Sequence, residues 1–266
     1  MTNAIGKLGI IGGNGALGSA IARGLLGAGT LSPAQIMISS RSRSLGGLSD
    51  VPGIEVVTDN QALADASDTI LLAVPPAQAG KIGIMARDRL VISVMAGLTV
   101  NRLASLTGAQ RIIRAMSSPA AARHLAYSPW VRSAGATPED ATRAEVLFSA
   151  CGLTDEVQTE DQIDQFTAMT GPVPGFVAFF AECMEHHATA RGIAPEVAAR
   201  AIRQLFLAAG TMMEDAGRPA GEHVQEMIDY AGTTAAGLQV LRAGPIAEAI
   251  SEGLDAAARK ARDMGR

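Results

Sequence analysis

Short apolar segments alternate with helical patterns along the first half of the chain. The apolar segments are rich in Val, Ile and Leu, as expected for parallel strands that are buried on both faces. They cover residues 8–11, 36–39, 69–74, 90–94 and 111–114. Ala-rich segments between them often open with Ser, Asp or Asn, as at 59–64 and 101–106, which is typical of helices. We therefore expect a doubly wound α/β sheet, because parallel neighbours need crossover helices.

The second half of the chain has a different pattern. From about residue 158 helical periodicity continues through long segments, interrupted mainly by Gly192, Gly217, Gly232 and Gly244. The segment that Pro195 opens has apolar residues at spacings of three and four, which form one face of a helix. These residues are Ile202, Leu205, Phe206, Ala209, Met212 and Met213. This face would pack within its own domain or against a second chain. We predict an α/β domain over 1–157 and an all-helical dimerisation domain over 158–266.

Composition and charge narrow the classes of function. The 266 residues are 48% hydrophobic and 18% charged, which is typical of a globular protein. The net charge is −4 and no cluster of Lys and Arg occurs, so nucleic acid is not expected as a partner. Cys151 and Cys183 lack metal-ligand spacing, which indicates a reducing cytoplasm and no metal site. The uncharged segment 166–181 contains Pro172 and Pro174 and is too short to span a membrane, so no membrane partner is expected.

A glycine-rich turn follows the first predicted strand. Its sequence is Gly13-Asn14-Gly15-Ala16-Leu17-Gly18, which fits the GxGxxG pattern and directly precedes a helical segment. In this context Gly13 allows a tight turn, Gly15 lets the backbone approach a pyrophosphate, and Gly18 lets the helix pack closely on the strand. The turn predicts a Rossmann dinucleotide-binding domain, with residues 13–17 at the cofactor.

The end of the second predicted strand bears on the choice of cofactor. A site for NAD usually has Asp or Glu there, which binds the ribose 2′-hydroxyl. This chain has Ser39-Ser40-Arg41-Ser42-Arg43 instead. Ser40, Arg41 and Arg43 offer hydroxyl and guanidinium donors to a 2′-phosphate. We therefore predict NADPH as the cofactor, preferred over NADH and bound by Ser40 and Arg41. The alternative is a solvated basic loop.

Four further segments carry motifs of one known family. Leu72-Ala73-Val74-Pro75-Pro76 is similar to Ala-Val-Lys-Pro of the pyrroline-5-carboxylate reductase family, and Ser93-Val94-Met95-Ala96-Gly97 to its Ser-Ile-Ala-Ala-Gly. Residues 111–116 resemble the stretch that leads to its Met-Pro-Asn. The most specific match is Gly232-Thr233-Thr234-Ala235-Ala236-Gly237-Leu238, which is similar to Gly-Gly-Thr-Thr-Ile-Ala-Gly-Leu. The resemblance covers nearly the whole chain.

This resemblance implies a fold, a reaction and a set of site residues. Enzymes of the family reduce a cyclic imino acid to proline with NADPH or NADH. Ala73, Val74 and Pro76 would lie beside the nicotinamide, and the hydroxyl of Thr234 would orient the imine nitrogen. Gly232 and Thr233 would present backbone groups to the substrate. The family's helical bundle interlocks two chains, which implies a homodimer, or a ring of dimers, with the active site at the dimer interface.

The substrate segment also departs from the family's motif. Asp229, Tyr230 and Ala231 stand at the first three positions of its Ser-Pro-Gly-Gly-Thr-Thr. An ionised Asp229 would repel the substrate carboxylate that the family's serine helps to hold. Asp229 would instead stabilise an iminium charge, and Tyr230 would donate a proton. Two alternatives are that Thr234 only caps a helix and that Asp229 is a solvated charge at a helix end.

Together these features predict an enzyme that uses NADPH to reduce 1-pyrroline-5-carboxylate to proline, or to reduce a related cyclic imine. Its catalytic residues would be Thr234, Asp229 and Tyr230. The alternative function is a non-catalytic NADP-binding protein that has lost its substrate chemistry. A hydroxyacid dehydrogenase is disfavoured, because such enzymes commonly use a lysine in the helical half and no lysine lies between Lys81 and Lys260.

Overall fold

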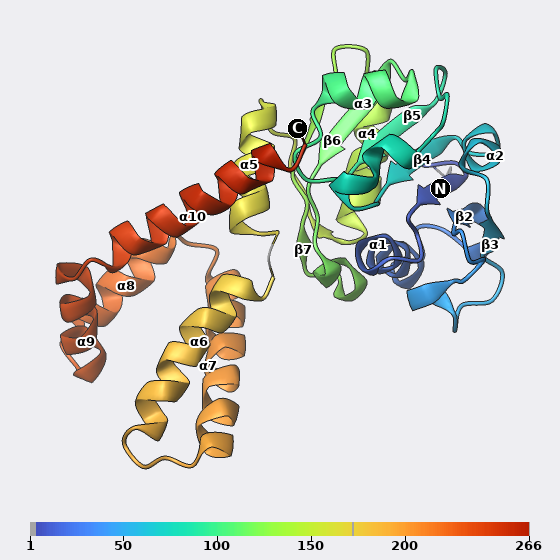
Figure 1. Ribbon diagram of the computed structural model, residues 1–266. Coiled ribbons are helices and arrows are strands. Elements are labelled where there is room, and N and C mark those ends of the chain that lie inside the picture. Colours follow the sequence, from blue (N-terminus) through green and yellow to red (C-terminus); the bar gives the residue numbers. More distant parts are fainter. Residues whose placement is uncertain (1–3, 172, 266) are drawn as a thin grey trace. The chain divides into compact units, whose positions relative to one another are not determined.

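A mainly parallel sheet forms the centre of the first of two compact units in the computed structural model, which describes residues 4–171 and 173–265 (Figure 1). In chain order its strands are β1 (Leu8–Ile11), β2 (Ile36–Ser39), β3 (Glu55–Val57), β4 (Thr69–Leu72), β5 (Leu90–Ser93), β6 (Arg111–Ala115) and β8 (Trp130–Arg132). They are ordered β3-β2-β1-β4-β5-β6-β8, and only β8 runs antiparallel to its neighbour. This is the strand order of a Rossmann domain with one added edge strand, so the predicted fold is confirmed.

Helices cover both faces of this sheet. They are α1 (Ala16–Gly27), α2 (Asn60–Asp65), α3 (Val100–Thr107), α4 (Pro138–Ser149) and α5 (Glu160–Met169), with the short 3₁₀ helices η1 (Pro33–Gln35), η2 (Gly46–Leu48), η3 (Pro76–Lys81) and η4 (Pro119–Arg123). Ile10 of β1 packs in one core cluster with residues of α1 and α4, whereas its neighbour Ile11 packs in another with residues of α2, η3 and α3. Adjacent strand residues face opposite sides, so the sheet is buried on both faces.

The predicted strands and the observed strands differ at the sheet's edges. All five predicted strands are present, with ends that differ by at most two residues. β3 and β8 were not predicted, because each has three residues and both are edge strands. The side chains of β3 are exposed or half-buried, so its sequence lacks the uniformly apolar pattern of the inner strands. A second sheet pairs β7 (Ala126–Tyr127) with β9 (Gly152–Leu153).

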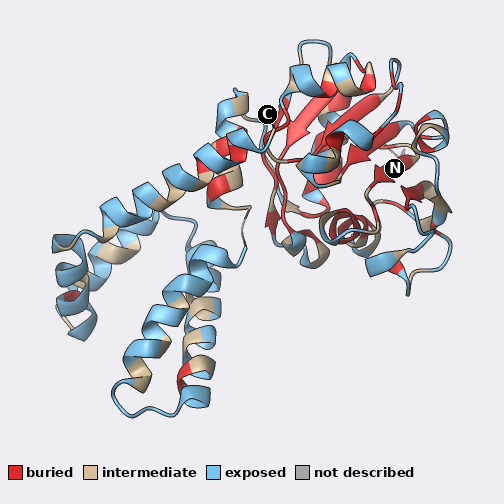
Figure 2. Cartoon of the chain, viewed as in Figure 1, coloured by how far each residue is buried: buried red, intermediate tan, exposed pale blue. Residues whose placement is uncertain are grey.

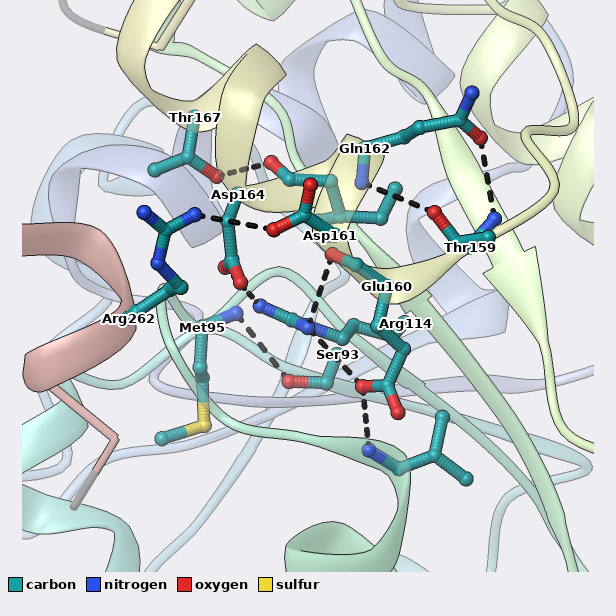
Figure 3. A network of polar contacts seen from close by, with 12 residues as sticks. Ser93, Met95, Arg114, Thr159, Glu160, Asp161, Gln162, Asp164, Thr167 and Arg262 are labelled. Atoms are coloured by element: carbon teal, nitrogen blue, oxygen red, sulfur yellow. Dashed lines mark hydrogen bonds and ion pairs between the residues drawn. The ribbon is translucent and has the colours of Figure 1, made fainter. Parts of the chain in front are cut away.

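A buried network of ion pairs holds α5 to the sheet (Figure 3). Arg114 of β6 is only 1% exposed, and its guanidinium donates to the Glu160 carboxylate at 3.0 Å and pairs with Asp164. Arg262 pairs with Asp161 at 3.0 Å, which attaches the end of the last helix to α5. The first unit accordingly contains the described residues up to Val173 and those from Leu254 onward. The domain boundary expected at 157/158 lies before α5 and stays a prediction.

The second unit, Pro174–Gly253, is entirely helical among its regular elements. It contains α6 (Gly175–Thr189), α7 (Pro195–Ala216), α8 (Ala220–Asp229), α9 (Thr233–Ala243) and the beginning of α10 (Ile246–Asp263). No residue of α6 or α8 is buried, and α7 and α9 bury one alanine each. Figure 2 shows that exposed residues dominate these helices, whereas the first unit has a buried core. The helical unit therefore has almost no core within a single chain.

Candidate functional site

A cavity of about 560 Å³ lies at the carboxyl ends of β1, β2 and β4. Its walls are the glycine turn after β1, residues 39–42 at the end of β2, Thr58 and Asn60 after β3, and residues 73–75, Gln78, Lys81 and Ile82 after β4. β1 is flanked by β2 on one side and by β4 on the other, so the chain reverses its order of strands at this point. Crevices at such a reversal are where open α/β sheets bind ligands.

The glycine turn brings the backbone against this cavity. Gly12 has φ +87°, a left-handed conformation that favours glycine, so the sharp turn falls one residue before Gly13. A Cβ on Gly13 would collide with the Ile38 side chain, and one on Gly18 would lie 2.5 Å from the Gly12 carbonyl oxygen. Gly15 is the N-cap of α1 and supplies no side-chain hydrogen bond. The first backbone N–H groups of α1 therefore remain available to an anion.

The end of β2 places polar and cationic groups in the cavity wall. Ser40 is buried, and its hydroxyl accepts a hydrogen bond from the Asn14 amide at 3.1 Å, which links the end of β2 to the glycine turn. Arg41 is exposed and lines the cavity. None of the described residues that line this cavity is Asp or Glu. The site therefore has no carboxylate that would repel a 2′-phosphate.

Most of the predicted cofactor residues lie together in this wall. The lining includes Asn14, Gly15, Ser40, Arg41, Ala73 and Val74. Four others are adjacent to it and not among the lining residues: Gly13, Ala16, Leu17 and Pro76. Arg43, with φ +55°, also lies outside the lining.

Four polar lining residues were missed by sequence reasoning: Thr58, Asn60, Gln78 and Lys81. The first two follow β3, a strand that the apolar pattern did not reveal, so nothing marked them as residues at a strand end. The other two lie on η3, and the resemblance pointed in this stretch only to Ala73, Val74 and Pro76. A search for polar residues shortly after every short β-prone segment would have found Thr58 and Asn60.

The predicted substrate residues form the connection between α8 and α9 in the second unit. Asp229 ends α8, Tyr230 is 83% exposed, and Ala231 has φ +55°, which is unfavourable for a residue with a Cβ. Gly232 is the N-cap of α9 and makes no side-chain hydrogen bond. Thr234 is the second residue of that helix, and its side chain is exposed to solvent. The residues predicted to bind the cofactor thus lie on the first unit, and those predicted to bind the substrate lie on the second.

Asp229 is connected to a short chain of polar side chains. Its carboxylate accepts a hydrogen bond from the Gln225 amide at 2.8 Å. The carbonyl oxygen of Gln225 in turn accepts one from Arg242 of α9 at 3.2 Å. Asp229 is therefore held by a neutral amide donor and remains exposed.

Other candidate chemistries find no support among the described residues. No group of three His, Cys, Asp or Glu side chains there could hold a metal ion. His187 contacts Arg191 just beyond the end of α6 at 3.2 Å, and His223 contacts Arg218 just before the start of α8 at 3.3 Å, so each belongs to a local polar pair. None of the helices in the described part of the chain combines the length and the apolar sequence that a membrane span requires.

Comparison with known proteins divides the chain in two. Residues 160–264 match the pyrroline-5-carboxylate reductase dimerisation domain, and residues 7–97 match the NADP oxidoreductase domain described as coenzyme F420-dependent. The pyrroline-5-carboxylate reductase of Methanosarcina acetivorans is 30% identical, and the match covers 98% of both chains. That of Arabidopsis thaliana is 27% identical over 98% of this chain and 96% of the plant enzyme.

Solved structures give the same result. A pyrroline-5-carboxylate reductase from Coxiella burnetii has a TM-score of 0.87 and 25% identity, and the match covers 98% of this chain and 99% of that one. The Plasmodium falciparum pyrroline carboxylate reductase with NADP bound has a TM-score of 0.83 and 23% identity over 98% of each chain, which supports the fold. With a relative at 30% identity over 98% of its length, the chain belongs to the pyrroline-5-carboxylate reductase family.

Proposed function

We propose that this protein reduces 1-pyrroline-5-carboxylate, or a closely related cyclic imine, with NADPH as the reductant. The observation that carries this proposal is the carboxylate-free cavity beside the glycine turn, in a chain that matches pyrroline-5-carboxylate reductases from end to end. The protein is thereby assigned to the NAD(P)-dependent oxidoreductases that act on a C=N bond.

The cofactor half of the site fits a phosphorylated dinucleotide. The uncapped N-terminus of α1 would bind the pyrophosphate through its backbone N–H groups. Ser40 and Arg41 would bind the 2′-phosphate, and this would make NADPH preferred over NADH. Ala73, Val74 and Pro76 would bound the nicotinamide. When bound, NADPH supplies the hydride that is added to the imine carbon.

The substrate half of the proposed site is the 229–234 segment. The reaction needs a hydride at the imine carbon and a proton at the nitrogen, and catalysis consists mainly in positioning the two reactants. The Thr234 hydroxyl would orient the C=N bond, and the exposed Tyr230 hydroxyl would supply the proton. Backbone N–H groups of Gly232 and Thr233 stand at the uncapped start of α9, which favours a bound carboxylate. Asp229 would stabilise positive charge on the substrate nitrogen.

A homodimer, or a ring of dimers, accounts for the exposed helices of the second unit. Phe179 and Leu207 are more than 60% exposed, as is Met212, although such side chains are usually buried. Residues 160–264 match a dimerisation domain, which supports association of two copies through these helices. Both cysteines are unpaired, which agrees with the reducing cytoplasm as the compartment.

The test is an assay of NADPH oxidation with purified protein. Pyrroline-5-carboxylate should be reduced, and 1-pyrroline, the same ring without its carboxylate, is the comparison that reports the effect of Asp229. Thr234→Val should lower turnover while leaving the dissociation constant of NADPH unchanged, and the exposed Thr211→Val on α7 is the matched control. Binding of NADPH without reduction of either ring would instead support a non-catalytic NADP-binding protein.

A further inference from the structure

Two unpaired cations face the cofactor cavity from different strands. Arg41 follows β2, and Lys81 is the last residue of η3, which follows β4. Both side chains are exposed and both line the cavity. Within the described part of the chain, neither forms a hydrogen bond or an ion pair. Their charges are therefore available to a ligand.

None of the described residues that line the cavity with these cations is negatively charged. The other polar side chains around the cavity are neutral, among them Ser42, Thr58 and Gln78. The pyrophosphate of a dinucleotide is already provided for by the α1 N-terminus and the glycine turn. The pyrophosphate therefore does not require the charges of Arg41 and Lys81. These two cations match the negative charge of a further phosphate group elsewhere on the dinucleotide.

The backbone next to Lys81 is held in place. The side-chain amide of Asn60, at the start of α2, donates to the carbonyl oxygen of Ile82 at 2.7 Å. This bond ties the residue after Lys81 to the segment that also contributes Thr58 to the cavity wall. Arg41 directly follows β2 and Lys81 ends η3, and both side chains line the same cavity of about 560 Å³. One ligand in this cavity is therefore bordered by both cations.

We propose that Lys81 is a specificity-determining residue that binds the 2′-phosphate of NADPH from the η3 wall, opposite Arg41. This inference rests on the proposed function, because it assumes that the cavity is the cofactor site. It assigns to Lys81 a role that neither the glycine turn nor the end of β2 predicts. The preference for the phosphorylated cofactor would then depend on two cations from separate strands.

The test measures binding directly by calorimetry. Adenosine 2′,5′-bisphosphate and 5′-AMP, together with NADP⁺ and NAD⁺, are titrated into the unmodified protein and into Lys81→Met, Lys81→Arg and Arg87→Met. Arg87 is an exposed cation that follows the same strand and does not line the cavity, so it controls for net charge. We expect Lys81→Met to weaken binding of NADP⁺ and of the bisphosphate about tenfold, with less than about a twofold change for NAD⁺ and 5′-AMP. Lys81→Arg should retain the preference, and Arg87→Met should change nothing.

Two results would overturn the proposal, and they differ from failure of the proposed function. An equal loss of NADP⁺ and NAD⁺ in Lys81→Met would place Lys81 at the pyrophosphate or the adenine instead. Unchanged binding of both would remove Lys81 from the site altogether. If the unmodified protein bound neither dinucleotide, the cofactor site would be wrong and the inference would fail with it.

Discussion

Replacing Arg114 by Met removes the guanidinium at the centre of the network that joins β6 to α5. Asp164 has a side chain only 9% exposed, and without Arg114 its carboxylate would be buried with no cation beside it. Such a loss costs about 3–5 kcal/mol in free energy of unfolding. Glu160 contributes much less, because its side chain is 34% exposed and still accepts the Val100 N–H at 2.9 Å. The expected destabilisation is therefore about 3–5 kcal/mol, nearly all of it from Asp164.

A double-mutant cycle separates the penalty of leaving Asp164 unpaired from the net contribution of the Arg114–Asp164 ion pair to stability. Urea unfolding, followed by circular dichroism at one protein concentration, would be measured for Arg114→Met, Asp164→Leu and the two together. The double variant should recover most of the stability that Arg114→Met loses, because an apolar pair leaves no buried charge unpaired. Arg132→Met is the control, since its ion pair with Glu156 is exposed and should contribute less than about 1 kcal/mol. A double variant no more stable than Arg114→Met would refute the reasoning.

Three further measurements test other parts of the structure. Burial opposes ionisation of Asp140, but hydrogen bonds from Arg111 and from the Thr137 backbone outweigh it and hold the pKa of Asp140 below its usual range. The ionised Asp140 carboxylate therefore stabilises the fold above the unfolded pKa of about 4, and this stabilisation is lost as the pH falls through the lower folded pKa. Asp140→Asn should lower the free energy of unfolding in urea by about 2 kcal/mol at neutral pH and by progressively less in acid. Ala231→Gly relieves a left-handed alanine and should raise the free energy of unfolding by up to about 1 kcal/mol, whereas no gain would mean that this backbone is not strained. Burial raises the pKa of the Cys151 thiol to about 12, so Cys151→Ala should leave the number of thiols that react with Ellman's reagent in the folded protein unchanged.

The inner strands and the glycine turn could be predicted because their signals are local. A strand covered by helices on both faces is buried at every position and therefore mainly apolar, as β1 and β4 are. The turn needs glycines where a Cβ would strike the backbone, and this requirement appears in the sequence as a fixed spacing. Both constraints act within a few residues, so the sequence of a short segment expresses them.

Features that depend on distant contacts could not be predicted in this way. Arg114 follows Ile112 and Ile113 in β6, and nothing near it in the sequence shows that Asp164 and Glu160 will pair with it. These ion pairs join α5 to β6 within the first compact unit. Lys81 is a similar case, because its place in the cavity follows from the order of β2, β1 and β4 in the sheet. The residues next to Lys81 in the sequence do not by themselves indicate that it lines the cavity.

The return of α10 to the first unit bears on how the protein folds during synthesis. A Cβ on Gly97, in the loop after β5, would collide with the carbonyl oxygen of Ala261, and Arg262 pairs with Asp161. Residues 254–265 are therefore part of the first unit, although they are synthesised after helices α6 to α9 of the second unit. A chain still on the ribosome would expose α6 to α9 before the surface beside β5 is covered. Helical segments of different nascent chains can thus associate before their Rossmann units are complete.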